Sequence, residues 1–142
     1  MKVTALFVYG TLRCSDIMEK VTGRKATPMA ASLKGYVVRC VKDDVYPGMV
    51  PMPEAMAEGG VYFDLEDADF AALDTFEGEM YDRRKVAVDL SDGRSETVYA
   101  YVVKPNFVSE LDRKEWRYAE FLDHSKERFL ETYLLKYLNG DS

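Results

Sequence analysis

The residue whose spacing best suits it to chemistry is Glu77, in the segment 73–78 (LDTFEG). Glu77 follows Leu73 by one helical turn and Phe70 by two, so all three fall on one face of a predicted helix. A carboxylate that faces apolar neighbours loses hydration of its charged form, which raises its pKa toward neutrality. Such a group can accept a proton and return it, so the segment predicts a general base.

An alternative exists because Glu77 stands at the expected end of the helix. If it lies beyond the last turn, it is solvated like most acidic side chains, and Asp74 or Glu79 becomes an equally good inward-facing candidate. Tyr81 and Arg83 follow at the start of a strand, where they are either members of a site or ordinary strand residues. Of these two, we favour Tyr81 as a site residue.

A second candidate segment consists of Tyr9, Gly10, Thr11 and Leu12, which directly follow an apolar run. Glycine adopts backbone angles that other residues avoid, so a tight turn at Gly10 can present consecutive backbone N–H groups. Such donors can hold an anion. Turns of this kind also serve merely to reverse the chain, and these four residues alone do not separate the two roles.

Cysteine and metal chemistry have little support in the sequence. Cys14 and Cys40 are the two cysteines, neither belongs to a CxxC pair, and His124 is the single histidine. A Cys–His dyad remains an alternative, although a lone histidine on a polar helical stretch more commonly lies at the surface. No ligands cluster at metal-binding spacing, so the sequence predicts no metal site.

Length and charge narrow the class of protein. The 142 residues, 47% of them hydrophobic, are expected to form one domain over residues 1–142. A net charge of −6 leaves little basic surface for nucleic acid. The apolar run 5–9 is too short to span a bilayer, so we expect no membrane segment and a cytoplasmic protein.

The remaining pattern predicts the elements that position the candidate residues. Runs rich in β-branched and aromatic residues predict strands at 4–9, 32–41, 59–65, 84–90 and 96–103. The Asp-Gly pair within residues 91–94 predicts a hairpin that makes the last two strands antiparallel neighbours. Two prolines and a glycine within residues 46–51 predict a fixed loop that takes no part in strand pairing.

Apolar residues at helical spacing predict three helices, at 15–21, at 67–76 and, longest of all, at 113–138. Gly23 and Gly78 follow the first two helices and are expected to end them. The long C-terminal helix is expected to cover the sheet and to end at Asn139 and Gly140.

Together these segments resemble the gamma-glutamyl cyclotransferase-like family, which includes gamma-glutamylamine cyclotransferases and plant avirulence-induced-gene-like proteins. The resemblance is carried, in matching order and spacing, by residues 7–12 (FVYGTL), 46–48 (YPG), 60–62 (GVY) and 73–78 (LDTFEG), with Tyr81 and Arg83 following. It spans roughly residues 3–103, and the paired YGTL and LDxFEG signatures are far more specific together than either is alone.

The resemblance implies an α+β fold, a small mixed β-barrel flanked by helices, here with a long C-terminal helix, and no metal or cofactor. It implies that Glu77 is the catalytic acid and base and that Tyr81 is a pocket tyrosine. The loop that grips the glutamyl end of the substrate matches Tyr9, Gly10, Thr11 and Leu12. The implied partner is a small γ-glutamyl compound, which cyclises to 5-oxoproline and releases its amine.

The sequence does not specify the γ-glutamyl compound or the oligomeric state. Met49, Met52 and Met56 could line the leaving-group pocket, although plain packing is the commoner role of such residues. A non-catalytic protein of the same fold that binds a small acidic metabolite is an alternative, and Glu77 argues against it because a carboxylate repels an anion unless it is protonated. A structural adaptor that uses the C-terminal helix is a third.

Overall fold

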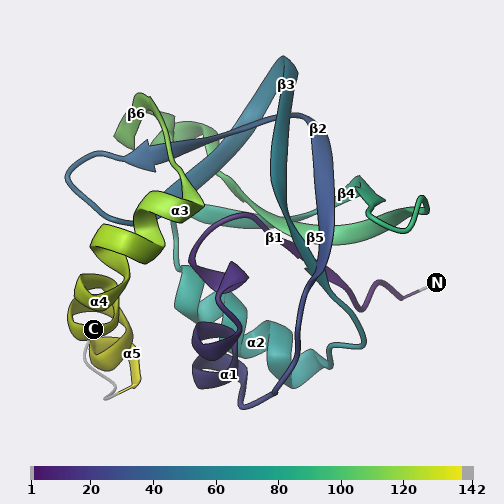
Figure 1. Ribbon diagram of the computed structural model, residues 1–142, viewed down its shortest axis with the longest axis horizontal. Coiled ribbons are helices and arrows are strands. Elements are labelled where there is room, and N and C mark those ends of the chain that lie inside the picture. The colour runs from purple at the N-terminus through teal and green to yellow at the C-terminus, as the bar shows by residue number, and fades with distance from the viewer. Residues whose placement is uncertain (1, 139–142) are drawn as a thin grey trace.

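Five strands close into a barrel in the computed structural model, which describes residues 2–138 (Figure 1). They are β1 (Leu6–Val8), β2 (Met29–Val41), β3 (Pro47–Tyr62), β4 (Tyr81–Leu90) and β5 (Ser95–Val103). Their order is β3-β1-β5-β4-β2, and pairing of β2 with β3 closes the ring. β1 is parallel to β5 and antiparallel to β3, so the predicted mixed barrel is confirmed.

Strand β1 is short but buried on both faces, because its side chains alternate between two clusters of apolar residues. Phe7 and Tyr9 belong to a cluster made of strand residues, which fills the barrel. Leu6 and Val8 belong to a second cluster, which also contains apolar side chains of the helices. A strand covered on both faces must be apolar throughout, and for this reason the run was recognisable in the sequence.

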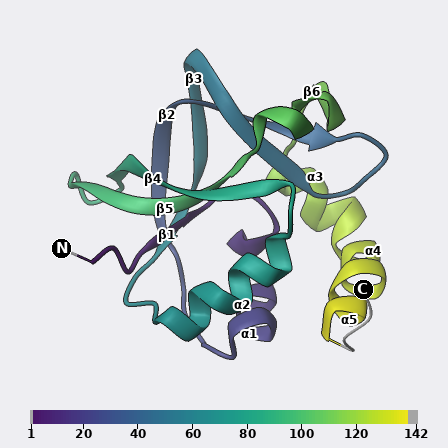
Figure 2. The same cartoon turned by 180° about the vertical axis from the view of Figure 1, so that it is seen from behind.

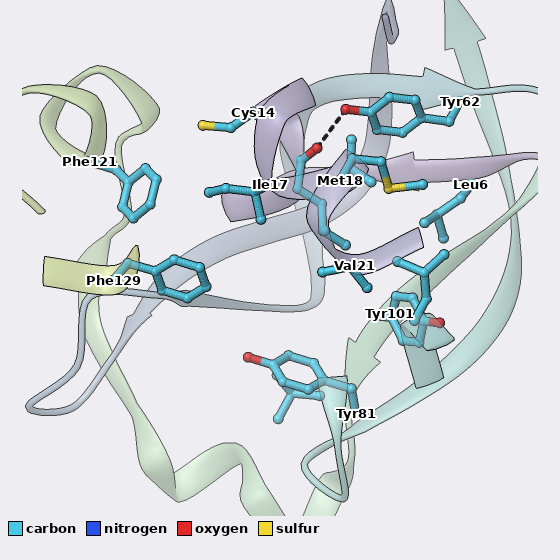
Figure 3. Packing of buried hydrophobic residues seen from close by; sticks show 14 of the residues in the cluster. Leu6, Cys14, Ile17, Met18, Val21, Tyr62, Tyr81, Tyr101, Phe121 and Phe129 are labelled. Carbon is cyan, nitrogen blue, oxygen red and sulfur yellow. Dashed lines mark hydrogen bonds between the residues drawn. The ribbon is translucent and has the colours of Figure 1, made fainter. Parts of the chain in front are cut away.

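The helices α1 (Ser15–Thr22) and α2 (Asp67–Glu77) lie side by side against the barrel (Figures 1 and 2). α1 buries Ile17 and Met18 completely against the second cluster (Figure 3). Between β1 and α1, the chain makes the short 3-10 turn η1 (Thr11–Arg13), and the Tyr62 hydroxyl donates a 2.8 Å hydrogen bond to the Leu12 carbonyl. Both predicted helices are therefore present, and the turn between strand and helix is fixed from the β3 side.

Helix α2, which carries Glu77, is held at both ends. At its start, the Asp69 carboxylate accepts a 2.8 Å bond from the Glu66 N–H as part of a capping box, and it also pairs with Arg24. At its end, Gly78 has a φ of 80° and its N–H donates to the Asp74 carbonyl. The helix stop predicted at this glycine is confirmed, and Glu77 is the last helical residue.

The predicted loop at residues 46–51 is wrong, because β3 begins at Pro47 and runs through this segment. Pro47 pairs with Cys40 and is the first residue of the strand. At that position the missing N–H of proline costs the strand no hydrogen bond within the ladder. Pro51 pairs with Tyr36, next to the register shift that follows Lys34. A proline is compatible with a strand at such a bulge, and the long β2–β3 ribbon bends there.

The C-terminal region begins with a strand rather than with the predicted helix at Arg113. After the 3-10 segment η2 (Pro105–Glu110), strand β6 (Leu111–Glu115) pairs with the end of β2. The helical run then begins at Tyr118 and comprises α3 (Tyr118–Glu120), a π segment (Phe121–Ser125), α4 (Lys126–Phe129), a second π segment (Leu130–Leu134) and α5 (Leu135–Leu138). Its expected end at Asn139 and Gly140 lies outside the described residues.

The hairpin prediction is confirmed, since β4 and β5 pair antiparallel along their whole length around Gly93, which has a φ of 91°. Among the described residues, no helix combines the length and the apolar character that crossing a membrane requires.

Gly59 allows β3 to approach β1, and its substitution tests that packing. A Cβ at Gly59 would lie 2.0 Å from the Val8 carbonyl oxygen, a backbone atom that cannot swing away. We expect Gly59→Ala to lower the free energy of unfolding by about 3 kcal/mol. Glu58→Ala, at the neighbouring exposed position, should change it by less than about 0.5 kcal/mol. Equal urea midpoints for the two variants would show that β1 and β3 are not packed in this way.

Candidate functional site

The residues that the sequence singled out surround one cavity of about 240 Å³. It lies among the end of β1, the starts of β3 and β4, the end of α2 and the C-terminal helix. All six predicted site residues line it, namely Tyr9, Gly10, Thr11, Leu12, Glu77 and Tyr81. The structure therefore brings together segments that are more than sixty residues apart in the chain.

The turn at residues 9–12 is held from several directions. The Tyr9 hydroxyl donates a 2.7 Å bond to the Tyr101 carbonyl of β5. The N–H groups of Arg13 and Cys14 close the turn on the carbonyls of Gly10 and Thr11. The N–H groups that precede them stand in the first turn of a short helix, where helical geometry supplies no acceptor. We therefore expect these N–H groups to be the backbone donors on this side of the cavity.

Gly10 leaves room for a close contact in the turn. Its φ of −126° and ψ of −132° lie outside the helical and extended ranges, so the expectation of a backbone conformation suited to glycine is not contradicted. A Cβ at Gly10 would also lie 2.6 Å from Cγ of Pro47. The absence of a side chain thus lets the first residue of β3 sit directly against the turn.

Tyr81 lines the cavity and holds Pro47 in place. Its hydroxyl donates a 2.7 Å bond to the Pro47 carbonyl, and the side chain is buried. Burial raises the pKa of Tyr81 well above its usual value, so the phenol stays protonated and remains a donor. Tyr81 therefore lines the cavity, and its hydroxyl fixes the start of β3 at Pro47.

Glu77 has the perturbed ionisation that its spacing predicted. Its pKa is raised to about 8, chiefly because burial removes hydration from the carboxylate and secondarily because Asp74 is a nearby negative charge. The residue as a whole is half-buried, since it borders the cavity. Near neutral pH this carboxyl group is therefore able both to take and to return a proton.

The two alternative acids do not line the cavity. Glu79 is exposed, and Asp74 borders a separate shallow hollow together with Arg83. Asp74 accepts bonds of 2.9 and 3.2 Å from the Arg83 guanidinium and one of 2.7 Å from the Tyr101 hydroxyl. Tyr81 and Tyr101 border both spaces, and the Tyr101 hydroxyl links this ion pair to the wall of the cavity.

Part of the wall is aromatic, and the sequence analysis found only half of it, since it singled out residues 46–48 and 73–78 but not the C-terminal helix as site segments. It consists of Tyr46, Phe76, Phe129 and Tyr133, and Met80 lies beside it. Helical apolar spacing identified the C-terminal members as packing residues, but no local signal shows which of them border a cavity. These residues reach the site from three different segments of the chain.

The methionines proposed for the pocket do not line it. Met49 is fully buried and belongs to the cluster that fills the barrel. Met52 and Met56 are exposed side chains of β3. Residue type alone suggested an adaptable lining, whereas strand alternation sends these side chains elsewhere.

Neither thiol has the contacts of a catalytic dyad. The Cys14 sulfur lies 3.4 Å from the Tyr118 hydroxyl, and the Cys40 thiol donates to the Glu115 carbonyl. Burial raises the pKa of both cysteines, which is the opposite of activation. His124 is exposed. Within residues 2–138, no three His, Cys, Asp or Glu side chains are grouped to hold a metal ion, and independence from metals stays a prediction.

Comparison with known proteins gives one consistent answer. The family model described as gamma-glutamyl cyclotransferase, AIG2-like, matches residues 6–120. Among curated relatives, AIG2-like protein D of Arabidopsis thaliana is 30% identical over 132 residues, covering 87% of each chain. AIG2-like protein C of the same plant is 33% identical over 130 residues, covering 88% of this chain and 73% of that protein.

Solved structures agree with the sequence comparison. A solution structure from Arabidopsis thaliana superposes with a TM-score of 0.70 at 28% identity, covering 100% of this chain and 89% of the other. A structure described as gamma-glutamyl cyclotransferase superposes with a TM-score of 0.64 at 16% identity, covering 72% of this chain and 68% of the other. At that identity the second likeness concerns the fold alone.

The raised pKa of Glu77 makes stability depend on pH. From the ordinary value of 4.5 up to about 8, the unfolded chain releases a proton that the folded chain keeps, so wild-type stability falls as pH rises. Glu77→Gln has no such proton. Relative to the wild type, we expect this variant to gain on the order of 2 kcal/mol between pH 5 and pH 8, since water in the open cavity offsets part of the burial.

Urea unfolding at the two pH values measures this gain. Glu79→Gln is the matched control, because Glu79 is exposed and should show no comparable change. If the Glu77→Gln gain is no larger than that of the control, Glu77 does not have a raised pKa in the folded protein.

Proposed function

Because the chain belongs to the gamma-glutamyl cyclotransferase, AIG2-like family, we propose that it is an enzyme that cyclises a small γ-glutamyl compound to 5-oxoproline and releases the attached amine. The observation that carries the proposal is that Glu77, with its raised pKa, borders the same cavity as the turn at residues 9–12. A base and a cluster of anion-binding donors are what a zwitterionic glutamyl group requires.

The turn at residues 9–12 is proposed to hold the α-carboxylate of the substrate. Backbone N–H groups bind an anion without adding positive charge, which suits a protein of net charge −6. Glu77 does not oppose this binding, because at neutral pH its carboxyl group is largely protonated. The substrate brings its α-ammonium group to Glu77 while its carboxylate stays on the turn.

In the proposed reaction, Glu77 as the carboxylate removes a proton from the α-ammonium group. The free amine then attacks the γ-carbonyl carbon of the same molecule, forming the ring C–N bond. The bond between that carbon and the leaving nitrogen breaks as Glu77 returns its proton to the leaving nitrogen. The ring nitrogen gives its second proton to the Glu77 carboxylate, which passes it to the released amine. The products are then 5-oxoproline and an ammonium ion, and Glu77 ends as the carboxylate with which it began.

No protein nucleophile is needed, because nucleophile and electrophile belong to one molecule. Holding the glutamyl chain folded, with the reacting atoms near each other, supplies much of the rate acceleration. This is consistent with thiols whose pKa values are raised and with a wall of bulky side chains that limits the substrate's conformations. The proposed substrates are small water-soluble metabolites, in keeping with the cytoplasmic location that the composition predicts.

Glu77→Gln is expected to abolish turnover, because the amide keeps the size of the side chain but cannot accept the proton. Loss of a general base lowers the rate by about 10²–10⁴-fold. The measurement is 5-oxoproline released from a panel of γ-glutamyl compounds, with circular dichroism to confirm folding.

Wild-type kcat/KM should rise with pH up to about 8, where Glu77 becomes ionised. EDTA should leave wild-type turnover unchanged.

A folded Glu77→Gln variant with wild-type turnover would refute the assigned role. Loss of activity in EDTA that zinc or manganese restores would refute the metal-free mechanism. If the wild type binds 5-oxoproline but converts no compound of the panel, the protein is a binding protein of this fold.

The position of the glutamyl end can be tested at Gly10. A valine there would collide with Pro47, so we expect Gly10→Val to lose at least tenfold in affinity for 5-oxoproline. Thr11→Ala should bind more nearly as the wild type, because the proposed donors are in the backbone. A crystal soaked with 5-oxoproline should show its carboxylate within hydrogen-bonding reach of residues 9–12 and its ring nitrogen facing Glu77. Ligand density outside this cavity would contradict the proposed site even if Gly10→Val fails to fold.

A further inference from the structure

The cavity has two chemically different sets of lining residues. One set, the turn at residues 9–12 together with Glu77, offers backbone donors and a carboxyl group. The other set is aromatic and consists of Tyr46, Phe76, Phe129 and Tyr133, which we call the aromatic wall. Half of this wall, Phe129 and Tyr133, lies beyond residue 120, where the match to the family model ends.

The four rings of the aromatic wall form a continuous chain of contacts. The ring centroids of Tyr46 and Tyr133 are 5.3 Å apart and nearly perpendicular. The Tyr133 and Phe129 centroids are 5.7 Å apart, and those of Phe129 and Phe76 are 6.3 Å apart. The first and third of these are edge contacts, and the rings of the second are tilted by 32°. Contacts at these distances fix the rings relative to one another, so the wall is a preformed surface.

The hydroxyl groups of Tyr46 and Tyr133 are both hydrogen-bonded to the Asp44 carboxylate, which does not line the cavity. The Tyr133 hydroxyl donates to Asp44, and the Tyr46 hydroxyl is hydrogen-bonded to the same side chain. Arg128 is close enough to Asp44 to offset part of its charge. With both hydroxyls held in this way, the wall offers ring carbon to a ligand.

We infer that the aromatic wall is the leaving-group subsite and selects γ-glutamyl compounds whose amine carries an uncharged apolar or aromatic group. The inference rests on the proposed function, which places the glutamyl end at residues 9–12 and Glu77. Of the remaining lining residues, the aromatic wall is the largest set, so the released amine is placed against it. An apolar substituent there gives up little hydration and gains ring contacts.

A charged substituent fits this subsite less well. An ammonium group would lose much of its hydration on entering, and the carboxylate nearest the wall, Asp44, is already bonded to two hydroxyls. Attraction of a cation to the ring faces is the competing effect. The relative turnover of apolar and cationic substrates therefore tests the inference directly.

The experiment compares three γ-glutamyl amides that differ only in the amine, namely methylamine, 2-phenylethylamine and 1,5-diaminopentane. We expect the wild-type kcat/KM to be at least tenfold higher for the phenylethyl than for the methyl compound, mainly through KM. The diaminopentane compound should be no better than the methyl compound. A phenylethyl preference below threefold, or a preference for the diaminopentane compound, would overturn the inference.

The three amides also separate this inference from the proposed function. If none of them releases 5-oxoproline, the proposed function fails and the subsite fails with it. If all are turned over without preference, the cyclotransferase remains and the subsite alone is wrong.

Variants of the C-terminal helix locate the preference. Tyr133→Leu, which removes a ring from the wall, should lower the ratio of phenylethyl to methyl kcat/KM to below threefold. Tyr133→Phe keeps the ring and should keep the ratio, which separates the wall from the Asp44 bond. Leu122→Ala, an exposed position of the same helix that does not line the cavity, should leave all three rates unchanged. An unchanged ratio in a folded Tyr133→Leu variant would refute the assignment.

Discussion

The seating of Pro47 against Gly10 is the contact on which the cavity depends. The gap left by the missing Cβ lets the start of β3 reach the end of β1, and the Tyr81 hydroxyl holds the Pro47 carbonyl from the start of β4. The Tyr9 bond to the Tyr101 carbonyl ties the same point to β5. Segments at the ends of β1, β3, β4 and β5 are therefore linked at one place. This part of the cavity wall is fixed by all four strands.

A second constraint is electrostatic and concerns the free energy lost when Glu77 ionises beside the cavity. Burial and the Asp74 charge both disfavour ionisation of Glu77, so the fold is weakened at the pH at which Glu77 becomes a base. The Arg83 pair and the Tyr101 hydroxyl hold Asp74 in place behind the wall. Proteins commonly lose some stability at functional groups. Here the capping box at Glu66 and the Gly78 stop hold helix α2, which carries Glu77, in place.

The parts of the structure that sequence predicted correctly are those set by local physics. Helix α2 has an apolar face, a capping box at Glu66 and a glycine stop, so the orientation of Glu77 follows from neighbouring residues. The β4–β5 hairpin follows from its Asp-Gly turn in the same way. The resemblance to the family rested on short contiguous segments, above all the paired YGTL and LDxFEG motifs, and could therefore be found in the sequence.

The failures share a physical cause, which is dependence on partners distant in the chain. β3 begins at Pro47 because this residue pairs with Cys40 of β2 and its carbonyl accepts a hydrogen bond from the Tyr81 hydroxyl. Nothing within residues 46–51 indicates these two partners. β6 is a strand only because the end of β2 provides a ladder for it. The aromatic wall likewise requires residue 46 to meet residue 133, and local spacing cannot distinguish a ring that fills a core from one that borders a cavity.

The C-terminal helix supplies the part of the aromatic wall that lies beyond the match to the family model. Its two π segments widen the turns and change which side chains face the barrel, so Phe121, Phe129 and Leu134 are all buried despite their uneven spacing. The barrel and α2 supply the turn, Glu77 and Tyr81 within the part that the family model matches, whereas Phe129 and Tyr133 come from beyond it. Under the proposed function, a change in that helix would alter the space for the leaving group without altering Glu77 or the turn at residues 9–12. One proposed reaction could then serve different amines, because the residues proposed for the chemistry and those proposed for the leaving group lie on separate elements.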